Sequence, residues 1–514
     1  MGHSYGAALV RAIWAKAMGG QPDGTGDLQQ AHVWASNISR LILAAAVARG
    51  WNQLAPVTTD VRIGVWLGNM LETVTRPGWG MLDVRRGAPW ITTTRLQTMD
   101  LNRKLEASGR TPPITVQLLG TVDDVVAPAD NVDLATGSNF FYVNVPGANH
   151  LNVVDVEGEV GAERRRLFLE ALLRRPEDLK ALAVSPEELR DMVDENLNDH
   201  DLDWADPGGN TSESSVSPVA VRPDVELVVF LTHGIRDYGH WTKRLAVRVK
   251  EAGRNRWPTP MKVRTVTSSY GFFPMGPFVL KAERRKRTGW LMDQYVTAKA
   301  AYPNAVFSFV GHSNGTYLAA SALKECPAIH FNDIVFAGSV VRTNFEWQDL
   351  MKPQHFGERK PQVGRVLNYV ATGDIVVALF PGGMQWMRFP DLGGAGHHGF
   401  EPDPQPNVRN IFYVPGSHDA ALKDHHWSEI TDFVLGGEFP PGVLERRPPY
   451  REDCWTPFVG VVGRAAGSAL LAFIAVVLSV ISGIVWGLSG FGIGALIIGL
   501  PLLTVLAGRV LTRI

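Results

Sequence analysis

The stretch Ala305-Val-Phe-Ser-Phe-Val310 is followed directly by Gly311-His-Ser-Asn-Gly315 and then by Thr316-Tyr-Leu-Ala-Ala-Ser-Ala-Leu-Lys-Glu325. The first segment is an apolar and aromatic run with the length of a buried strand, whereas the last is rich in the helix formers alanine and leucine. The middle segment has the pattern Gly-x-Ser-x-Gly, which places a serine on a tight strand-to-helix turn. The sequence therefore predicts a strand, a sharp turn at Ser313 and a helix.

Further strand-like segments lie on both sides of this turn in the chain. One covers residues 226–232, and three follow at 333–336, 365–370 and 410–414, with helical or loop segments between them. Such alternation is typical of an α/β domain with a mostly parallel sheet and helices on both faces.

Two polar residues follow the later strands in the positions that a serine nucleophile needs. A serine hydroxyl reacts at neutral pH when an imidazole takes its proton and a carboxylate orients that imidazole. Asp374 comes directly after the strand 365–370, and His418 follows the strand 410–414. The sequence predicts that His418 takes the proton of Ser313 and that Asp374 orients His418.

Two further pairs of histidines are less favoured by the pattern as functional residues. His425 and His426 stand at the start of a helix-like segment. His397 and His398 lie in a glycine-rich stretch with no carboxylate or cysteine at ligand spacing, which favours a solvated loop over a metal pair. We expect no metal and no cofactor.

On these residues, the segment 225–437 resembles the α/β-hydrolase-fold serine hydrolases, a family of esterases, lipases, thioesterases and peptidases. The resemblance implies that Ser313 is the nucleophile, His418 the general base and acid, and Asp374 its orienting partner. It also implies an oxyanion hole formed by backbone N–H groups, which would belong to Gly234, Ile235 and Asn314. The loop reads His-Gly-Ile-Arg-Asp where many lipases carry His-Gly-Gly-Gly, so the donor in this loop stays open.

The beginning of the chain repeats the same order of parts. Gly2-His-Ser-Tyr-Gly6 precedes a helix-like segment, and strands are expected near 40–45, 114–119 and 140–145. This region resembles the second half of the same family. The parts that precede the serine turn are missing from the pattern, so we expect a truncated hydrolase-like copy.

This first copy also contains a second candidate triad. Ser4 lies in the Gly-x-Ser-x-Gly pattern, Asp123 follows the strand near 114–119, and His150 follows the strand near 140–145. Asp124 is a less favoured alternative for the acid.

The end of the chain contains a long apolar stretch. Residues 465–508 carry no charge and divide at 487–490 into two parts of about 24 and 18 residues, each near the length that crosses a bilayer. The sequence predicts a transmembrane hairpin. Arg464 before it and Arg509 after it predict that the rest of the chain faces the cytoplasm.

An apolar segment at 268–280 runs into a basic cluster at 281–287. This pattern fits a lid or a surface against anionic lipid, and it fits an ordinary packing loop followed by a solvated helix equally well. The predicted organisation is a truncated α/β-hydrolase-like domain, a polar linker, a complete α/β-hydrolase domain and a transmembrane helical hairpin, over residues 1–175, 176–224, 225–440 and 456–514.

The charge composition bears on which classes of partner the protein binds. Among the 514 residues, 50 Lys and Arg nearly balance 51 Asp and Glu, so the charge gives no reason to expect nucleic-acid binding. We expect a membrane-anchored serine hydrolase that cleaves carboxylic esters or thioesters of acylated or lipid-like substrates, with the bilayer as a partner. The alternatives are a catalytically inactive membrane scaffold or sensor and, less favoured, a regulated peptidase. The sequence leaves the oligomeric state open.

Overall fold

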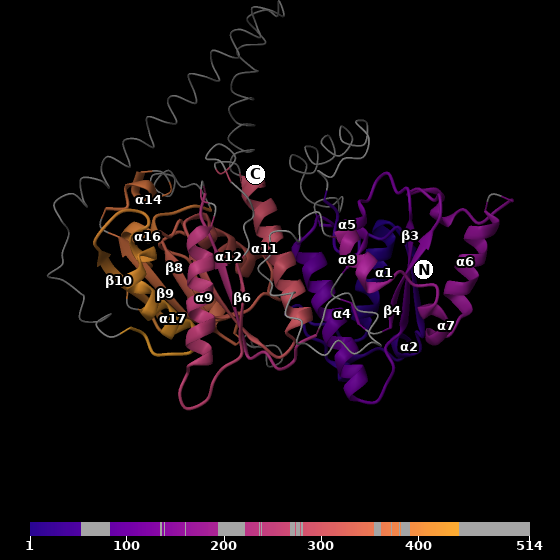
Figure 1. The fold of residues 1–514 in the computed structure, drawn as a ribbon, viewed down its shortest axis with the longest axis horizontal. Coiled ribbons are helices and arrows are strands. Elements are labelled where there is room, and N and C mark those ends of the chain that lie inside the picture. Colours follow the sequence, from indigo (N-terminus) through magenta and orange to yellow (C-terminus); the bar gives the residue numbers. More distant parts are fainter. Residues whose placement is uncertain are drawn as a thin grey trace, which may run out of the picture. The chain divides into compact units, whose positions relative to one another are not determined.

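The computed structural model describes most of the chain up to residue 440. The described residues are 1–52, 83–133, 136–137, 139–159, 161–193, 221–235, 237, 239–267, 273, 278, 281–353, 361–371, 373–379, 381, 391–403 and 405–440. They form two compact units, drawn in Figure 1. Within the described residues, the first unit comprises 1–228, 287–305 and 322–330, and the second comprises 229–286, 306–321 and the residues from 331 onward.

The first unit contains a four-stranded sheet in the order β1-β2-β3-β4, with all neighbours parallel. Its strands are β1 (Gly2–His3), β2 (Arg40–Ala44), β3 (Ile114–Gly120) and β4 (Phe140–Val145). Its helices include α1 (Tyr5–Ala17), α2 (Val33–Ser36), α4 (Pro89–Ala107), α5 (Pro128–Asn131), α6 (Ala162–Leu173), α7 (Pro176–Lys180) and α8 (Pro186–Val193), with short 3-10 turns η1 (Leu28–Gln30) and η2 (Asn152–Val154). The strand β1, which the sequence pattern does not predict, leads directly into Ser4.

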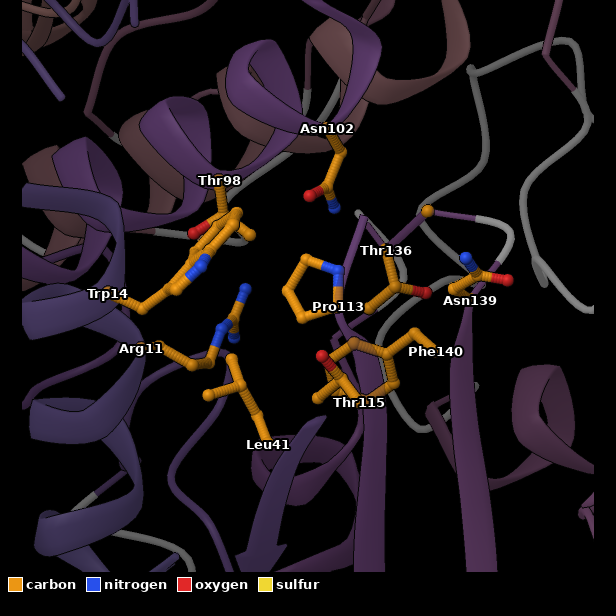
Figure 2. Close-up of a pocket in the computed structure, with 11 residues that line it drawn as sticks. Arg11, Trp14, Leu41, Thr98, Asn102, Pro113, Thr115, Thr136, Asn139 and Phe140 are labelled. Carbon is orange, nitrogen blue, oxygen red and sulfur yellow. The ribbon is translucent and has the colours of Figure 1, made fainter. Parts of the chain in front are cut away.

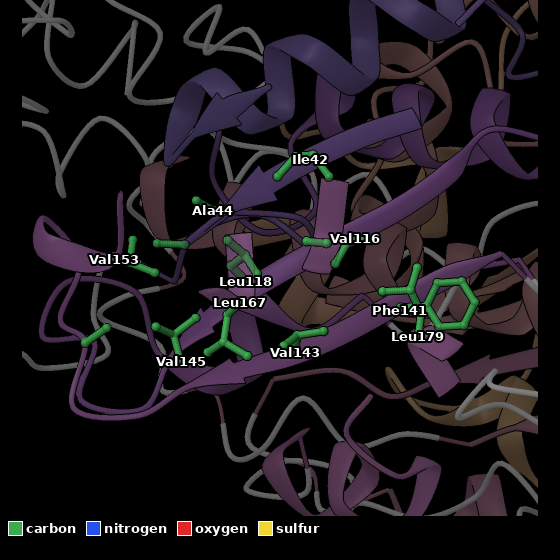
Figure 3. Packing of buried hydrophobic residues seen from close by; sticks show 13 residues of the cluster. Ile42, Ala44, Val116, Leu118, Phe141, Val143, Val145, Val153, Leu167 and Leu179 are labelled. Atoms are coloured by element: carbon green, nitrogen blue, oxygen red, sulfur yellow. The ribbon is translucent and has the colours of Figure 1, made fainter. Parts of the chain in front are cut away.

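Alternation along the strands gives this sheet two apolar faces. One face packs against α6 and α7, and Figure 3 shows its cluster of small and branched side chains, which includes Ile42, Val116, Val143 and Leu167. On the other face, Leu41 belongs to a second cluster with residues of α1 and α4. The sheet is thus buried on both sides, as a parallel sheet requires.

The second unit contains a six-stranded sheet in the order β10-β9-β8-β7-β5-β6. Its strands are β5 (Leu227–Thr232), β6 (Val263–Val266), β7 (Val306–His312), β8 (Phe331–Ala337), β9 (Val363–Ala371) and β10 (Val408–Val414). The strands β7, β8, β9 and β10 pair in parallel. The chain between and after these strands also forms α9 (His240–Arg254), α11 (Lys281–Ala301), α12 (Asn314–Glu325), α13 (Trp347–Met351), α14 (Ile375–Leu379), α16 (Ala395–His398) and α17 (Trp427–Val434), with 3-10 turns η3 (Ala420–Leu422) and η4 (Asp424–His426).

The strand order of the second sheet reverses between β7 and β5. From β7 the chain adds β8, β9 and β10 outward on one side, whereas β5 and β6 lie on the other side. In an open α/β sheet, ligands bind beyond the carboxyl ends of the strands at such a reversal. The serine turn after β7 and the predicted oxyanion loop after β5 both lie at this place.

The region predicted as a linker begins with ordered helices. The short helices α7 and α8 occupy its first part, and the backbone N–H of Glu188 donates to Ser185 Oγ at 3.1 Å, which satisfies one of the free donors at the start of α8. Residues 194–220 lie outside the described residues. The helix α11 crosses the boundary between the two units, since its residues from 287 onward group with the first.

The prediction of two transmembrane helices is wrong, and so is the prediction of a multi-pass location with the rest of the chain facing the cytoplasm. Crossing a bilayer takes about 20 predominantly apolar residues. None of the helices that the structure describes combines this length with this apolar composition. The longest of them, α11 with 21 residues, carries charged side chains along its length. The segment 456–514, for which the sequence predicts the hairpin, lies outside the described residues.

The basic cluster at the start of α11 includes a residue that packs inside the second unit. Arg284 is 1% exposed and donates to Asp391 Oδ2 at 2.6 Å and to the carbonyl oxygen of Phe278. Its guanidinium also lies 5.0 Å from the centre of the Tyr317 ring. Arg284 is therefore a buried packing residue and is not available to a lipid headgroup. Most of the apolar segment 268–280 lies outside the described residues.

Candidate active site

Both candidate serines occupy the same kind of turn. Ser4 lies between β1 and α1, and Ser313 lies between β7 and α12. Their φ angles are 54° and 52°, a region that residues other than glycine rarely adopt. In each unit the serine N–H donates to the last residue of the neighbouring strand, Ala44 O at 2.9 Å and Ala337 O at 3.0 Å. We call each of these strand–serine–helix turns an elbow.

A Cβ atom added at the glycines of the two elbows would meet different neighbours. A Cβ placed on Gly2 would lie 2.4 Å from Gly6 O, so the turn closes only without a side chain there. A Cβ on Gly315 would lie 2.5 Å from Thr232 O, because β5 packs against the elbow in the second unit. A Cβ on Gly6 would meet no described atom within 4 Å. The first elbow therefore has no counterpart of β5 beside it within the described residues.

The structure brings Ser4, His150 and Asp123 together in one hydrogen-bonded chain. His150 Nε2 lies 2.9 Å from Ser4 Oγ, and His150 Nδ1 lies 3.1 Å from Asp123 Oδ2. Ser4 follows β1, Asp123 follows β3 and His150 follows β4, so all three lie at the carboxyl end of the sheet. Asp124 contacts only the backbone N–H of His150, at 3.4 Å, and does not reach the ring.

Asp123 is held as a carboxylate. Burial alone would raise its pKa, but hydrogen bonds from His150 and from the backbone N–H groups of Val126 and Val125 lower the pKa of Asp123 below its ordinary value of 3.8. These backbone donors lie 2.8 and 2.9 Å from Oδ1. The ionised Asp123 can therefore fix His150 with its proton on Nδ1 and its lone pair toward Ser4.

In the second unit the structure pairs the predicted base and acid. His418 Nδ1 lies 2.9 Å from Asp374 Oδ2 and 3.0 Å from Oδ1, and the Asp374 side chain is fully buried. Gly338 has φ 54°, and a Cβ on it would come within 2.8 Å of His418 Nδ1, so this glycine lets the imidazole approach. Within the described residues, the structure gives no hydrogen bond between Ser313 Oγ and His418.

The predicted oxyanion loop lies against Ser313. A Cβ on Gly234 would lie 2.6 Å from Ser313 Cβ and 3.2 Å from Ser313 Oγ. His233 Nδ1 donates to Gly234 O at 2.7 Å, which holds this loop in place. Asn314 begins α12, and Ile235 follows Gly234 in the same loop. Because Gly234 has no side chain, the backbone of this loop can approach an oxygen at Ser313 more closely than it could with a larger residue at that position.

The other predicted histidines lie elsewhere. His425 and His426 belong to η4, where His426 Nδ1 is 3.8 Å from Glu429 and its ring is 5.4 Å from the Tyr369 ring. His397 and His398 lie on α16 with ring centres 4.7 Å apart. In the part of the chain that the structure describes, no group of three or more His, Cys, Asp or Glu side chains is arranged to hold a metal.

The sequence reading missed a buried charge network in the first unit. Arg49 and Arg95 donate to Asp293 at 2.7 and 2.6 Å, and Arg95 and Arg11 donate to Asp133 at 2.7 and 3.2 Å. All five side chains are at most 5% exposed. Partners up to 244 residues apart leave no local pattern in the sequence, so only the three-dimensional structure reveals them.

The first unit contains a cavity, whose lining residues are drawn in Figure 2. Its lining includes Leu41, Thr115 and Phe140, each within the first two residues of its strand, together with Arg11 and Asn102. The triad lies at the opposite, carboxyl ends of the same strands. The cavity is therefore not the pocket that would hold a substrate at Ser4.

The same order of parts occurs in both units. Each has a serine elbow, a helix, a second strand, a strand followed by the carboxylate and a last strand followed by the histidine. This repeated order in parallel sheets supports an α/β-hydrolase-like fold and agrees with the α/β part of the predicted fold class.

No family model matches the sequence, and no curated protein matches it. Among solved structures, a poly(3-hydroxybutyrate) depolymerase from Bordetella parapertussis is 15% identical with a TM-score of 0.28, covering 44% of this chain and 84% of that chain. A cell surface hydrolase from Lactobacillus plantarum is 14% identical with a TM-score of 0.24, covering 44% and 97%. A cutinase-like protein from Cryptococcus sp. is 12% identical with a TM-score of 0.23, covering 43% and 100%.

Proposed function

We propose that the chain is a serine hydrolase that cleaves carboxylic esters. The observation that carries this proposal is the hydrogen-bonded chain from Ser4 Oγ through the His150 ring to Asp123, with distances of 2.9 and 3.1 Å. A serine, an imidazole and a buried carboxylate in this order are the parts of a nucleophile activated by a general base.

The reaction proceeds in two steps at Ser4. Its Oγ attacks the ester carbonyl carbon while His150 Nε2 takes the proton, and His150 then gives that proton to the departing alkoxide, so that an alcohol leaves and an acyl-serine remains. Water then attacks the acyl-serine while His150 accepts its proton. His150 gives this proton to Ser4 Oγ as the bond between the acyl carbon and Ser4 Oγ breaks, so that the acid leaves and the serine hydroxyl is restored. The proposed donor to the oxyanion is the backbone N–H of Tyr5, the residue after the nucleophile.

We propose a second centre of the same chemistry at Ser313. His418 and Asp374 are already paired, and the Gly234 loop lies against the serine. This centre requires a hydrogen bond between Ser313 Oγ and His418, and catalytic hydrogen bonds often tighten only when substrate binds. The proposed oxyanion donors are the backbone N–H of Asn314 and an N–H of the Gly234-Ile235 turn.

The acyl-chain length of the preferred ester is set by the pocket beside the reacting serine. A lipid-like substrate stays a prediction from the sequence. Hydrolysis of p-nitrophenyl esters with acyl chains of increasing length separates a preference for small esters from a preference for long chains.

Labelling with a fluorophosphonate probe gives the number of catalytically active serines directly. An activated serine attacks its phosphorus atom and displaces fluoride, which adds a fixed mass for each active site. We expect two adducts on the wild-type chain, one on Ser4→Ala, one on Ser313→Ala and none on the double variant, by intact-protein mass spectrometry. Ser108→Ala, at the end of α4, is the control and retains both adducts.

The same measurement tests the alternatives. If the folded wild-type chain takes up no probe and hydrolyses no ester, the proposal is wrong and a binding or scaffold role replaces it. If the wild-type chain takes up a single adduct, and either Ser4→Ala or Ser313→Ala alone abolishes it, the chain has one active centre, at the serine whose replacement abolishes the adduct. A chain that labels and cleaves peptide amides in preference to esters is a peptidase.

A further inference from the structure

We propose that the histidine preceding each nucleophile, His3 in the first unit and His312 in the second, is a positioning residue for the catalytic histidine. His3 Nε2 donates to the backbone carbonyl oxygen of His150 at 2.7 Å. His312 Nε2 donates in the same way to the carbonyl oxygen of His418 at 3.2 Å. The inference rests on the proposed function, because it assigns these bonds a task in that reaction.

The two contacts match in more than their hydrogen bonds. The rings of His3 and His150 lie 5.0 Å apart with 46° between their planes. The rings of His312 and His418 lie 4.7 Å apart with 47° between their planes. Each donor is the last residue of its strand, and each acceptor lies in a loop after the last strand of its sheet. Each unit forms this arrangement from its own residues.

The bond joins two parts of the site that are otherwise separate in the chain. The serine is fixed by its elbow, whereas the base lies on a loop whose position decides whether Nε2 reaches Oγ. A donor one residue before the nucleophile holds that loop relative to the elbow itself, so serine and base move together. A displacement of about 1 Å at such a site costs up to about a hundredfold in rate.

The protonation state of His312 suits this task. A carbonyl oxygen only accepts hydrogen bonds, so the proton must be on Nε2. Burial, together with the neighbouring His418, lowers the pKa of His312 to about 3, which keeps its imidazole neutral. Its Nδ1 is buried and, among the described residues, has no partner. A neutral ring leaves the positive charge that develops on His418 during the reaction unopposed.

The test replaces the donor while the triad stays intact. His3→Leu removes the N–H, and His3→Gln retains a side-chain N–H at a similar reach. Both are made in the Ser313→Ala background, so that only the first centre turns over a p-nitrophenyl ester. We expect His3→Leu to lower kcat by about tenfold to a hundredfold with KM little changed, and His3→Gln to recover most of the loss. His312→Leu and His312→Gln in the Ser4→Ala background repeat the test.

The controls separate this inference from the proposed function. His32→Leu, at the exposed residue that precedes α2, retains full kcat, and thermal unfolding shows whether each variant is folded. If His3→Leu and His312→Leu are folded and retain full kcat, or if the glutamine variants are as slow as the leucine variants, the inference is wrong while ester hydrolysis stands. If the parent single-serine variants neither label with fluorophosphonate nor turn over ester, the proposed function itself fails.

Discussion

At the residue scale, the proton on His150 decides whether Ser4 can react. The carboxylate of Asp123 accepts from Nδ1, which leaves Nε2 free to take the serine proton. An amide in place of that carboxylate can donate to Nδ1 and so stabilise the tautomer with its proton on Nε2, facing the serine. The reactive state of Ser4 therefore depends on the charge of a side chain that never touches substrate.

Asp123→Asn is expected to lower kcat for ester hydrolysis by about 10³- to 10⁴-fold in the Ser313→Ala background, because the imidazole is held in the wrong tautomer. The matched control is Asp124→Asn, whose carboxylate does not contact the ring, and we expect it to change kcat by less than about tenfold. Steady-state kinetics on one p-nitrophenyl ester measures both. A slower Asp124→Asn than Asp123→Asn would assign the acid to Asp124 instead.

At the element scale, buried charge pairs join the helices of the first unit in addition to their apolar packing. Asp293 on α11 accepts from Arg95 on α4 and from Arg49 after β2, and Asp133 links Arg95 to Arg11 on α1. Burial opposes the charge on Asp293, yet Arg49 and Arg95 lower its pKa far below the ordinary value. The carboxylate therefore stays ionised and its removal would leave two buried guanidinium groups short of a partner.

Asp293→Asn is expected to reduce the free energy of unfolding by about 3–5 kcal/mol, the usual cost of breaking one side of a buried ion pair. Urea denaturation followed by circular dichroism gives the value. Glu163→Gln removes the carboxylate of an exposed pair with Arg166 on α6 and serves as the control, with an unchanged midpoint. If the two variants have equal midpoints, the buried network does not hold these helices together.

The same elements show what the sequence can and cannot predict. Chain order, glycine spacing and apolar runs were enough to predict the strands β2 to β4 and the places of Ser4, Asp123 and His150, because each of these signals is local. The network around Asp293 and the bond from His3 to His150 were not predicted, because they join residues far apart in the chain. The distance between Ser313 and His418 was equally inaccessible, since it depends on the path of a loop rather than on its composition.

At the scale of the whole molecule, each proposed centre is complete within one unit. Ser4, Asp123 and His150 all belong to the first unit, whereas Ser313, Asp374 and His418 all belong to the second. No proposed proton transfer passes from one unit to the other. The two centres differ in their surroundings, because β5 and its loop lie beside Ser313 while the described residues place no such strand beside Ser4.

Because the centres share no residue, we expect their rates to add. For one p-nitrophenyl ester, kcat/KM of Ser4→Ala and of Ser313→Ala should sum to the wild-type value within about twofold, as distant and independent sites do. The ratio between the two single variants should change with acyl-chain length, because only the second centre is bordered by the Gly234 loop. A Ser4→Ala variant in which Ser313 also loses its fluorophosphonate adduct, while the chain remains folded, would mean that the centres depend on each other.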